Sequence, residues 1–260
     1  MRMGPIQRFV NRSLCAGILL LTTIAAQAVD PGAALTPCPA ALNLTASEVA
    51  ARLMIRNAER AQKLGRVDSN RQYNLDYTGF PALSAHMEVK AVYTPQGTKQ
   101  FTVVSESGSH ILRNHVLHKL LESEEEASSD AANRDAVALT TANYDFSLLG
   151  CEAGSHPLYV MKVEPLRESK FLYRGTIWID SQDFAVTRIE AEPAKNPSVW
   201  TKRSEIHHEY QKIGEFYLPA LNQTVTDTRF GGKAVLTIRY QGYKLEQHMA
   251  MGSAGSGSHP

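Results

Sequence analysis

The chain has 260 residues, of which 43% are hydrophobic and 20% charged, and its formal net charge is +1. This composition is typical of a folded protein and excludes a disordered one, and the length fits one β-rich domain or two small ones. The near-neutral charge offers no basic excess that would recruit nucleic acid or an anionic membrane surface.

Residues 1–28 predict a cleaved secretory signal peptide. Three arginines precede an apolar run from Leu14 to Ala26, and Ala26-Gln27-Ala28 has the small-x-small pattern of a cleavage site. The run is shorter than the roughly 20 residues of a membrane-spanning helix. Cleavage would remove three basic residues and no acid, leaving 24 basic and 26 acidic residues and a formal charge of −2. We therefore expect a periplasmic protein without a transmembrane segment in its mature chain.

Two cysteines remain after cleavage, Cys38 and Cys151. An exported compartment permits a disulfide between them. Two separate thiols fit the sequence equally well, so both alternatives stay open.

A helix is expected after a flexible lead-in at residues 29–44. Thr45 and Glu48 have the spacing of a capping box, and apolar residues from Val49 to Leu64 recur at helical spacing, with Gly65 as a stop. From Arg71 the period changes to two, which predicts three strands, one starting at Arg71 and the others at residues 83–93 and 99–105.

Residues 108–150 interrupt this strand pattern. Apolar residues at helical spacing and an acidic cluster at Glu122–Glu126 predict a helical insert whose second part is helical or irregular. It could fold across the sheet as a lid or form an external flap. Strands resume at residues 158–164, and a run of antiparallel strands follows from Phe171 to Tyr243. Residues 249–260 are rich in Gly and Ser and are expected to form a disordered tail.

The sequence contains no motif that indicates catalysis, so we expect no enzyme, no cofactor and no metal site. It lacks a Gly-x-Ser-x-Gly elbow, a phosphate-binding glycine loop and a His-Glu-x-x-His pair. His207 and Glu209 could share one face of a strand but His208 could not, which argues against a metal site there.

The order of these elements resembles the outer-membrane lipoprotein-sorting family, the LolA/LolB-like proteins of Gram-negative periplasms. The sharpest match is the hairpin in which Gly175-Thr176-Ile177-Trp178-Ile179-Asp180 is followed by Arg188-Ile189-Glu190. The resemblance covers about residues 45–247 and implies an α+β, mostly antiparallel fold. Its sheet would be a curved half-barrel of about eleven strands with a helical lid over a hydrophobic cavity. Relatives use such a cavity to carry or sense lipid-modified molecules.

Two functions follow as hypotheses. The first is a periplasmic carrier that binds a lipid or an acylated lipoprotein without covalent chemistry, in a domain spanning residues 45–248. The second is a structural or regulatory envelope module of the same fold, which binds a protein and no lipid. Alternation alone selects the expected cavity lining, and the opposite face, with Trp178, remains an alternative. The expected lining residues are Tyr73, Leu75, Tyr77, Met87, Val89, Phe101, Met161, Tyr173, Ile177, Ile189, Leu236 and Ile238.

Overall fold

The structure is a computed structural model that describes residues 35–94, 96–196, 198–229 and 231–247. The expected signal peptide at residues 1–28 and the expected tail at residues 249–260 lie outside the described residues. In the described part, no helix is both long and apolar enough to cross a membrane.

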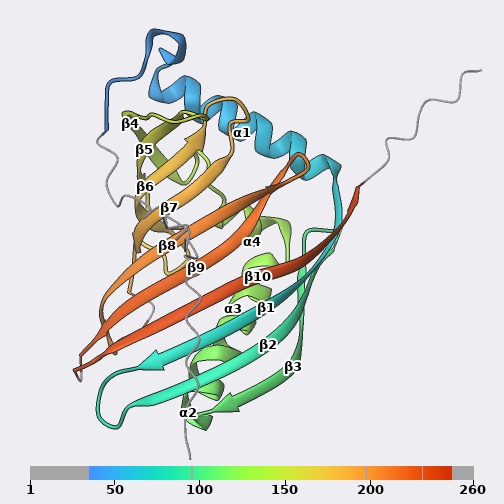
Figure 1. The fold of residues 1–260 in the computed structure, drawn as a ribbon, viewed down its shortest axis with the longest axis vertical. Coiled ribbons are helices and arrows are strands. Elements are labelled where there is room, and N and C mark those ends of the chain that lie inside the picture. The colour runs from blue at the N-terminus through green and yellow to red at the C-terminus, as the bar shows by residue number, and fades with distance from the viewer. Residues whose placement is uncertain (1–34, 95, 197, 230, 248–260) are drawn as a thin grey trace, which may run out of the picture. The chain divides into compact units, whose positions relative to one another are not determined.

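Ten strands form one open antiparallel sheet (Figure 1). Each strand pairs with its neighbours in the order β3-β2-β1-β10-β9-β8-β7-β6-β5-β4, so β3 and β4 are the edges. The fold is therefore α+β and mostly antiparallel, as expected, with ten described strands where about eleven were anticipated. The strands are β1 Leu64–Tyr77, β2 Leu83–Tyr93, β3 Lys99–Gly108, β4 Tyr144–Glu152, β5 Leu158–Pro165, β6 Tyr173–Asp180, β7 Val186–Pro193, β8 Thr201–Ile213, β9 Phe216–Thr228 and β10 Lys233–Gln247.

Helix α1 (Ala46–Lys63) begins at the predicted capping box. The backbone N–H of Glu48 donates to the Thr45 hydroxyl, and the Glu48 carboxylate accepts from the Thr45 N–H at 2.8 Å. The helix buries Val49, Ala50 and Leu53. Strand β1 follows at once, seven residues earlier than expected, because its inward positions include the polar Ser69 and Arg71, which hide the alternation.

The predicted insert is helical only in its first part. It contains α2 (His110–Leu112), a π-helical turn (Arg113–Leu117), α3 (His118–Ser128) and α4 (Ala131–Val137). The expectation of a helical insert reaching residue 150 is wrong for its last residues, because β4 begins at Tyr144. There, Tyr144, Phe146 and Leu148 alternate with more exposed neighbours, which is the period of a strand.

One row of side chains crosses the sheet from β2 to β4. Residues that face each other on neighbouring antiparallel strands point to the same side. The strand register therefore places the apolar residues of both halves of the sheet on the same face, and the row is polar only in its middle. Its members are Met87, Tyr73, Ile238, Asn222, His208, Ile189, Ile177, Met161 and Leu148.

Helices cover this face in two places. Leu112, Leu117 and Leu121 pack on the apolar cluster of β1, β2 and β10, while Val49 and Leu53 of α1 pack on the cluster of β5, β6 and β7. In Figure 1, α3 lies behind β10 and β1, and α1 runs along the upper strands. The core is therefore two apolar clusters on one face, separated by the middle of the row.

Cys38 and Cys151 are joined by a disulfide, and the backbones of Thr36 and Cys151 form a β-bridge. These contacts attach the last part of the expected flexible lead-in to the edge strand β4. A short 3₁₀ turn at Ala40–Leu42 connects this attachment to α1.

Candidate ligand-binding cavity

A cavity of about 310 Å³ lies between the C-terminal half of α1 and strands β6 to β9. Its wall is mostly apolar, with three tyrosines and one arginine. It is lined by Asn57, Arg60, Ala61, Leu64, Leu139, Tyr173, Ala185, Val186, Ile189, Tyr210, Phe216, Tyr217 and Leu218. The volume is at the lower end of the range of small-molecule sites, which is roughly 300–1,000 Å³.

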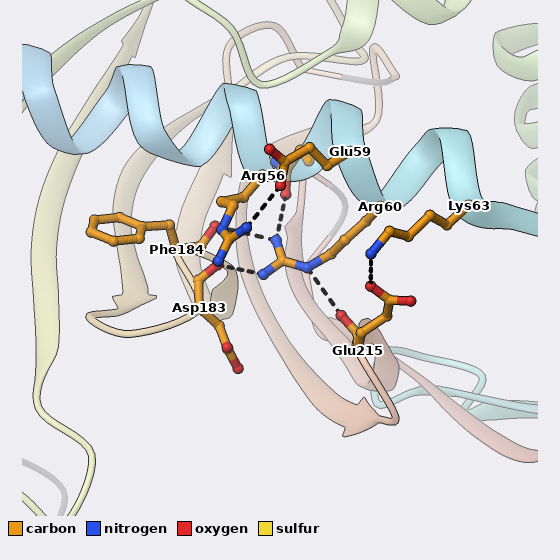
Figure 2. A network of polar contacts seen from close by, with 8 residues as sticks. Arg56, Glu59, Arg60, Lys63, Asp183, Phe184 and Glu215 are labelled. Carbon is orange, nitrogen blue, oxygen red and sulfur yellow. Dashed lines mark hydrogen bonds and ion pairs between the residues drawn. The ribbon is translucent and has the colours of Figure 1, made fainter. Parts of the chain in front are cut away.

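Arg60 closes one side of the cavity and is held by backbone carbonyls. Figure 2 shows its guanidinium between two turns of the sheet. It donates to the carbonyl oxygens of Glu215 at 3.0 Å and Phe184 at 3.3 Å, and to that of Asp183. On the same helix, Lys63 pairs with the Glu215 carboxylate at 2.5 Å. These contacts fasten α1 to the β6–β7 and β8–β9 turns and fix the position of its cationic side.

Asp183 and Tyr217 extend this polar rim. The Tyr217 hydroxyl donates to Asp183 Oδ2 at 2.6 Å, and Lys212 donates to the same oxygen. These hydrogen bonds, that of Lys212 first, lower the pKa of Asp183. Burial and the Asp183 contact raise the pKa of Tyr217, so the phenol stays neutral beside the carboxylate. The rim therefore holds fixed charges of both signs, while the wall behind it is uncharged.

The cavity wall contains two more neutral phenols. Burial raises the pKa of Tyr210 to about 12 and raises that of Tyr173 well above its usual value. A buried phenol of this kind can donate one hydrogen bond to a carbonyl or carboxylate of a ligand. The site can thus bind an apolar chain and recognise a polar group at one end of it.

The expected lining residues all lie on or beside the helix-covered face, but in two different settings. Tyr173 and Ile189 line the cavity, and Met161 and Ile177 are buried behind it in the same cluster. The other eight belong to or pack against the second cluster, where leucines of α2, the π-helical turn and α3 occupy the space. Those eight are Tyr73, Leu75, Tyr77, Met87, Val89, Phe101, Leu236 and Ile238.

Several lining residues were not among those expected from the sequence. Tyr210, Phe216 and Leu218 come from β8 and β9, and Leu139 follows α4. The alternation of β8 could have indicated Tyr210. No sequence signal shows that Leu139 returns to the sheet after the helices. Trp178, the marker of the opposite face, packs away from the cavity against Arg188 and donates to Glu152 at 2.8 Å.

Histidines of β8 and of α3 make ordinary polar contacts. His207 lies 2.8 Å from Glu209 on one face of β8, and His118 lies 2.9 Å from Glu106. His208 points to the other face, as the strand period requires. Across the described ranges, no group of three or more His, Cys, Asp or Glu side chains is arranged to hold a metal ion.

No family model and no curated protein matches this chain. Among solved structures, it is similar to a putative outer-membrane lipoprotein-sorting protein domain from Vibrio parahaemolyticus, with 12% identity, 79% of this chain and 95% of that chain covered, and a TM-score of 0.44. A LolA superfamily protein from Nitrosomonas europaea gives 12% identity, 78% and 94% coverage and a TM-score of 0.38. The MucA/MucB complex of Pseudomonas aeruginosa gives 10% identity, 74% and 93% coverage and a TM-score of 0.25.

Proposed function

We propose that the protein is an exported, envelope-located binding protein that holds one acyl chain of a lipid or a lipoprotein without covalent chemistry. The observation that carries this proposal is the cavity between α1 and β6–β9, with its apolar wall and its polar rim. Each methylene transferred from water into such a wall contributes about 0.8 kcal/mol and needs no polar partner. The volume suits a single chain better than the several chains of a whole lipoprotein anchor.

The rim supports a ligand with a polar or anionic end. Arg60, Lys63 and Lys212 bring positive charge to this side of the domain, although each already has an oxygen partner. A carboxylate or phosphate ester arriving there would compete with Glu215 and Asp183 for these donors. The fixed arrangement would therefore orient the ligand with its apolar chain inward.

Native mass spectrometry of the protein purified from a Gram-negative host tests the proposal. We expect co-purified lipid on the wild type and on Val104→Trp, an exposed control on β3. We expect little on Val186→Trp, whose larger side chain fills the cavity. Fluorescence of cis-parinaric acid should give the same order. Lipid-free protein that binds no cis-parinaric acid, or equal binding by both variants, would overturn the acyl-chain function.

A second candidate function is a protein-binding envelope module without a ligand. It is favoured by the half of the sheet formed by β1, β2 and β10. There Leu112, Leu117 and Leu121 of α2, the π-helical turn and α3 pack on the strands and fill the space beneath the helices. Lipid-free protein that captures the same single envelope protein with wild type and Val186→Trp alike would support this candidate against the first.

A further inference from the structure

Three connections lie next to one another at one end of the sheet. They are the β1–β2 connection (residues 78–82) and the described parts of the β7–β8 connection (residues 194–196 and 198–200) and of the β9–β10 connection (residues 229, 231 and 232). The Thr78 N–H donates to the Lys233 carbonyl at 2.9 Å, and the Arg229 N–H donates to the Trp200 carbonyl at 2.9 Å. In Figure 1 the first and third of these connections are neighbours at the left. We call this region the connection edge.

The connection edge exposes large apolar side chains. Phe80 is 100% exposed, Val199 is 77% exposed and Trp200 is 57% exposed. A single exposed apolar residue is ordinary on a protein surface. Here two of the three are aromatic, and the connections that carry them are hydrogen-bonded at the two sides of the β9–β10 connection, at Arg229 and at the adjoining Lys233 of β10. Trp is the residue that membrane proteins favour at the boundary between lipid and water.

Positive charge surrounds the same place. A polar hollow of about 470 Å³ beside Val199 is lined by five cations, namely Arg174, Lys195, Lys202, Arg203 and Arg229, and by two acids, Glu168 and Glu192. Both acids are paired with Arg174, at 3.8 and 4.0 Å. Arg203 lies 3.4 Å from Glu205. Within the described residues, Lys195, Lys202 and Arg229 form no ion pair.

We propose that the connection edge docks on the surface of a bilayer that contains anionic phospholipid. Phe80, Val199 and Trp200 would enter the interface, and Lys195, Lys202 and Arg229 would contact phosphate groups. Apolar insertion combined with nearby cations is the combination that gives reversible membrane binding. The near-neutral composition predicted no such attraction. Composition sums the charges over the whole chain, whereas the fold gathers these cations at one end.

Flotation with vesicles of phosphatidylcholine, with and without phosphatidylglycerol, tests the proposal on the full chain. We expect binding only to the vesicles that contain phosphatidylglycerol, weakened by added salt because the charges are exposed. Each cation near an anionic surface contributes about fivefold in affinity, so K195Q/K202Q/R229Q should bind on the order of a hundredfold more weakly. The matched control K90Q/K119Q/K244Q, with three lysines outside the connection edge and outside the cavity rim, should bind like the wild type.

A second set of variants separates insertion from electrostatic attraction. Phe80→Ser should weaken binding, while Val104→Ser, at an exposed apolar position on β3, should not. The chain has two tryptophans, and Trp178 is buried. A blue shift of emission on adding vesicles should therefore disappear in Trp200→Phe. Absence of binding at low salt, equal binding to neutral vesicles, or equal loss in the patch and control variants would overturn the proposal.

Discussion

The Arg71 guanidinium of β1 and the Glu124 carboxylate of α3 form an ion pair at 2.9 Å between the sheet and the helix that covers it. Arg71 is sandwiched between the rings of Phe101 and Tyr240, each 4.9 Å from the guanidinium carbon, and Lys99 reaches the same Glu124 oxygen at 3.1 Å. Burial raises the pKa of Glu124, but Lys99 and Arg71 outweigh it and lower the pKa overall. The contact therefore holds α3 on the sheet with both groups charged.

Glu124→Gln should destabilise the fold, because it leaves Arg71 buried without its counter-charge. Breaking a buried ion pair by removing one partner costs about 3 kcal/mol or more. Urea unfolding measures this loss. Glu122→Gln is the control, because the Lys119–Glu122 pair on the same helix is exposed and such pairs contribute about 0 to 1 kcal/mol. Equal stability of the two variants would mean that Arg71 does not need its partner.

Acid should destabilise the protein through His208 before the carboxylates titrate. Burial lowers the pKa of His208 to about 4, and the Asn222 side chain, opposite it on β9, only partly opposes this. In the unfolded chain the pKa is about 6.5, so from pH 6.5 down to 4 only the unfolded state takes up the proton. The free energy of unfolding should therefore fall with pH across this window, by up to about 3 kcal/mol.

His208→Gln should flatten the pH dependence of unfolding between pH 6.5 and 4.5. His207→Gln, on the opposite face of β8, should leave it unchanged. Stability that is constant across this range in the wild type would show that His208 is solvated and protonates freely.

Gly175→Ala should destabilise the β6–β7 hairpin. Gly175 has φ +157°, and an added Cβ would lie 2.2 Å from the Glu190 carbonyl oxygen of the paired strand. Such an approach forces the strands apart, and we expect a loss of about 2 kcal/mol or more. Gly214→Ala is the control, because its φ of +61° is also unfavourable but its Cβ would meet nothing within 4 Å. It should cost about 1 kcal/mol. Thermal unfolding that ranks Gly214→Ala as the more damaging change would contradict this account.

Cys38→Ser/Cys151→Ser should lower the free energy of unfolding by about 4 kcal/mol. The disulfide links residues that are 113 positions apart, and a cross-link across so long a loop restricts the unfolded chain strongly. Reductant should lower the stability of the wild type by the same amount and leave the double variant unchanged. A wild type that is insensitive to reductant under unfolding conditions would contradict the bond's role.

The strands and the first helix could be predicted where local patterns and the final packing agree. The Thr45–Glu48 capping box is confirmed, and β2 has its predicted bounds of 83–93. The prediction is wrong at β4, because this strand lies inside the predicted insert. Alternation there is short, and only residues 138–143 separate it from the helical residues of α4.

The cavity could not be derived from alternation, because alternation identifies a face of a strand and says nothing about what covers it. Ile177 and Met87 have the same inward signal, but neither borders open space. Ile177 is buried in the cluster under α1, and Met87 in the cluster that the leucines of α2 and α3 fill. Alternation also gave no sign that Asn222 and His208 point to the helix-covered face, because polar side chains at these positions hide the strand period.

The open sheet has two edge strands, β3 and β4, and a residue from elsewhere in the chain hydrogen-bonds to part of each edge. At β4, Thr36 forms two backbone hydrogen bonds with Cys151, at 2.9 and 3.1 Å. At β3, the Ser128 hydroxyl accepts a hydrogen bond from the Lys99 N–H at 3.0 Å. Unpaired backbone groups on an edge strand can pair with a strand of another molecule. Because the Cys38–Cys151 disulfide holds Thr36 against β4, this edge would stay covered in an oxidising compartment. In a reducing compartment it would be exposed to self-association.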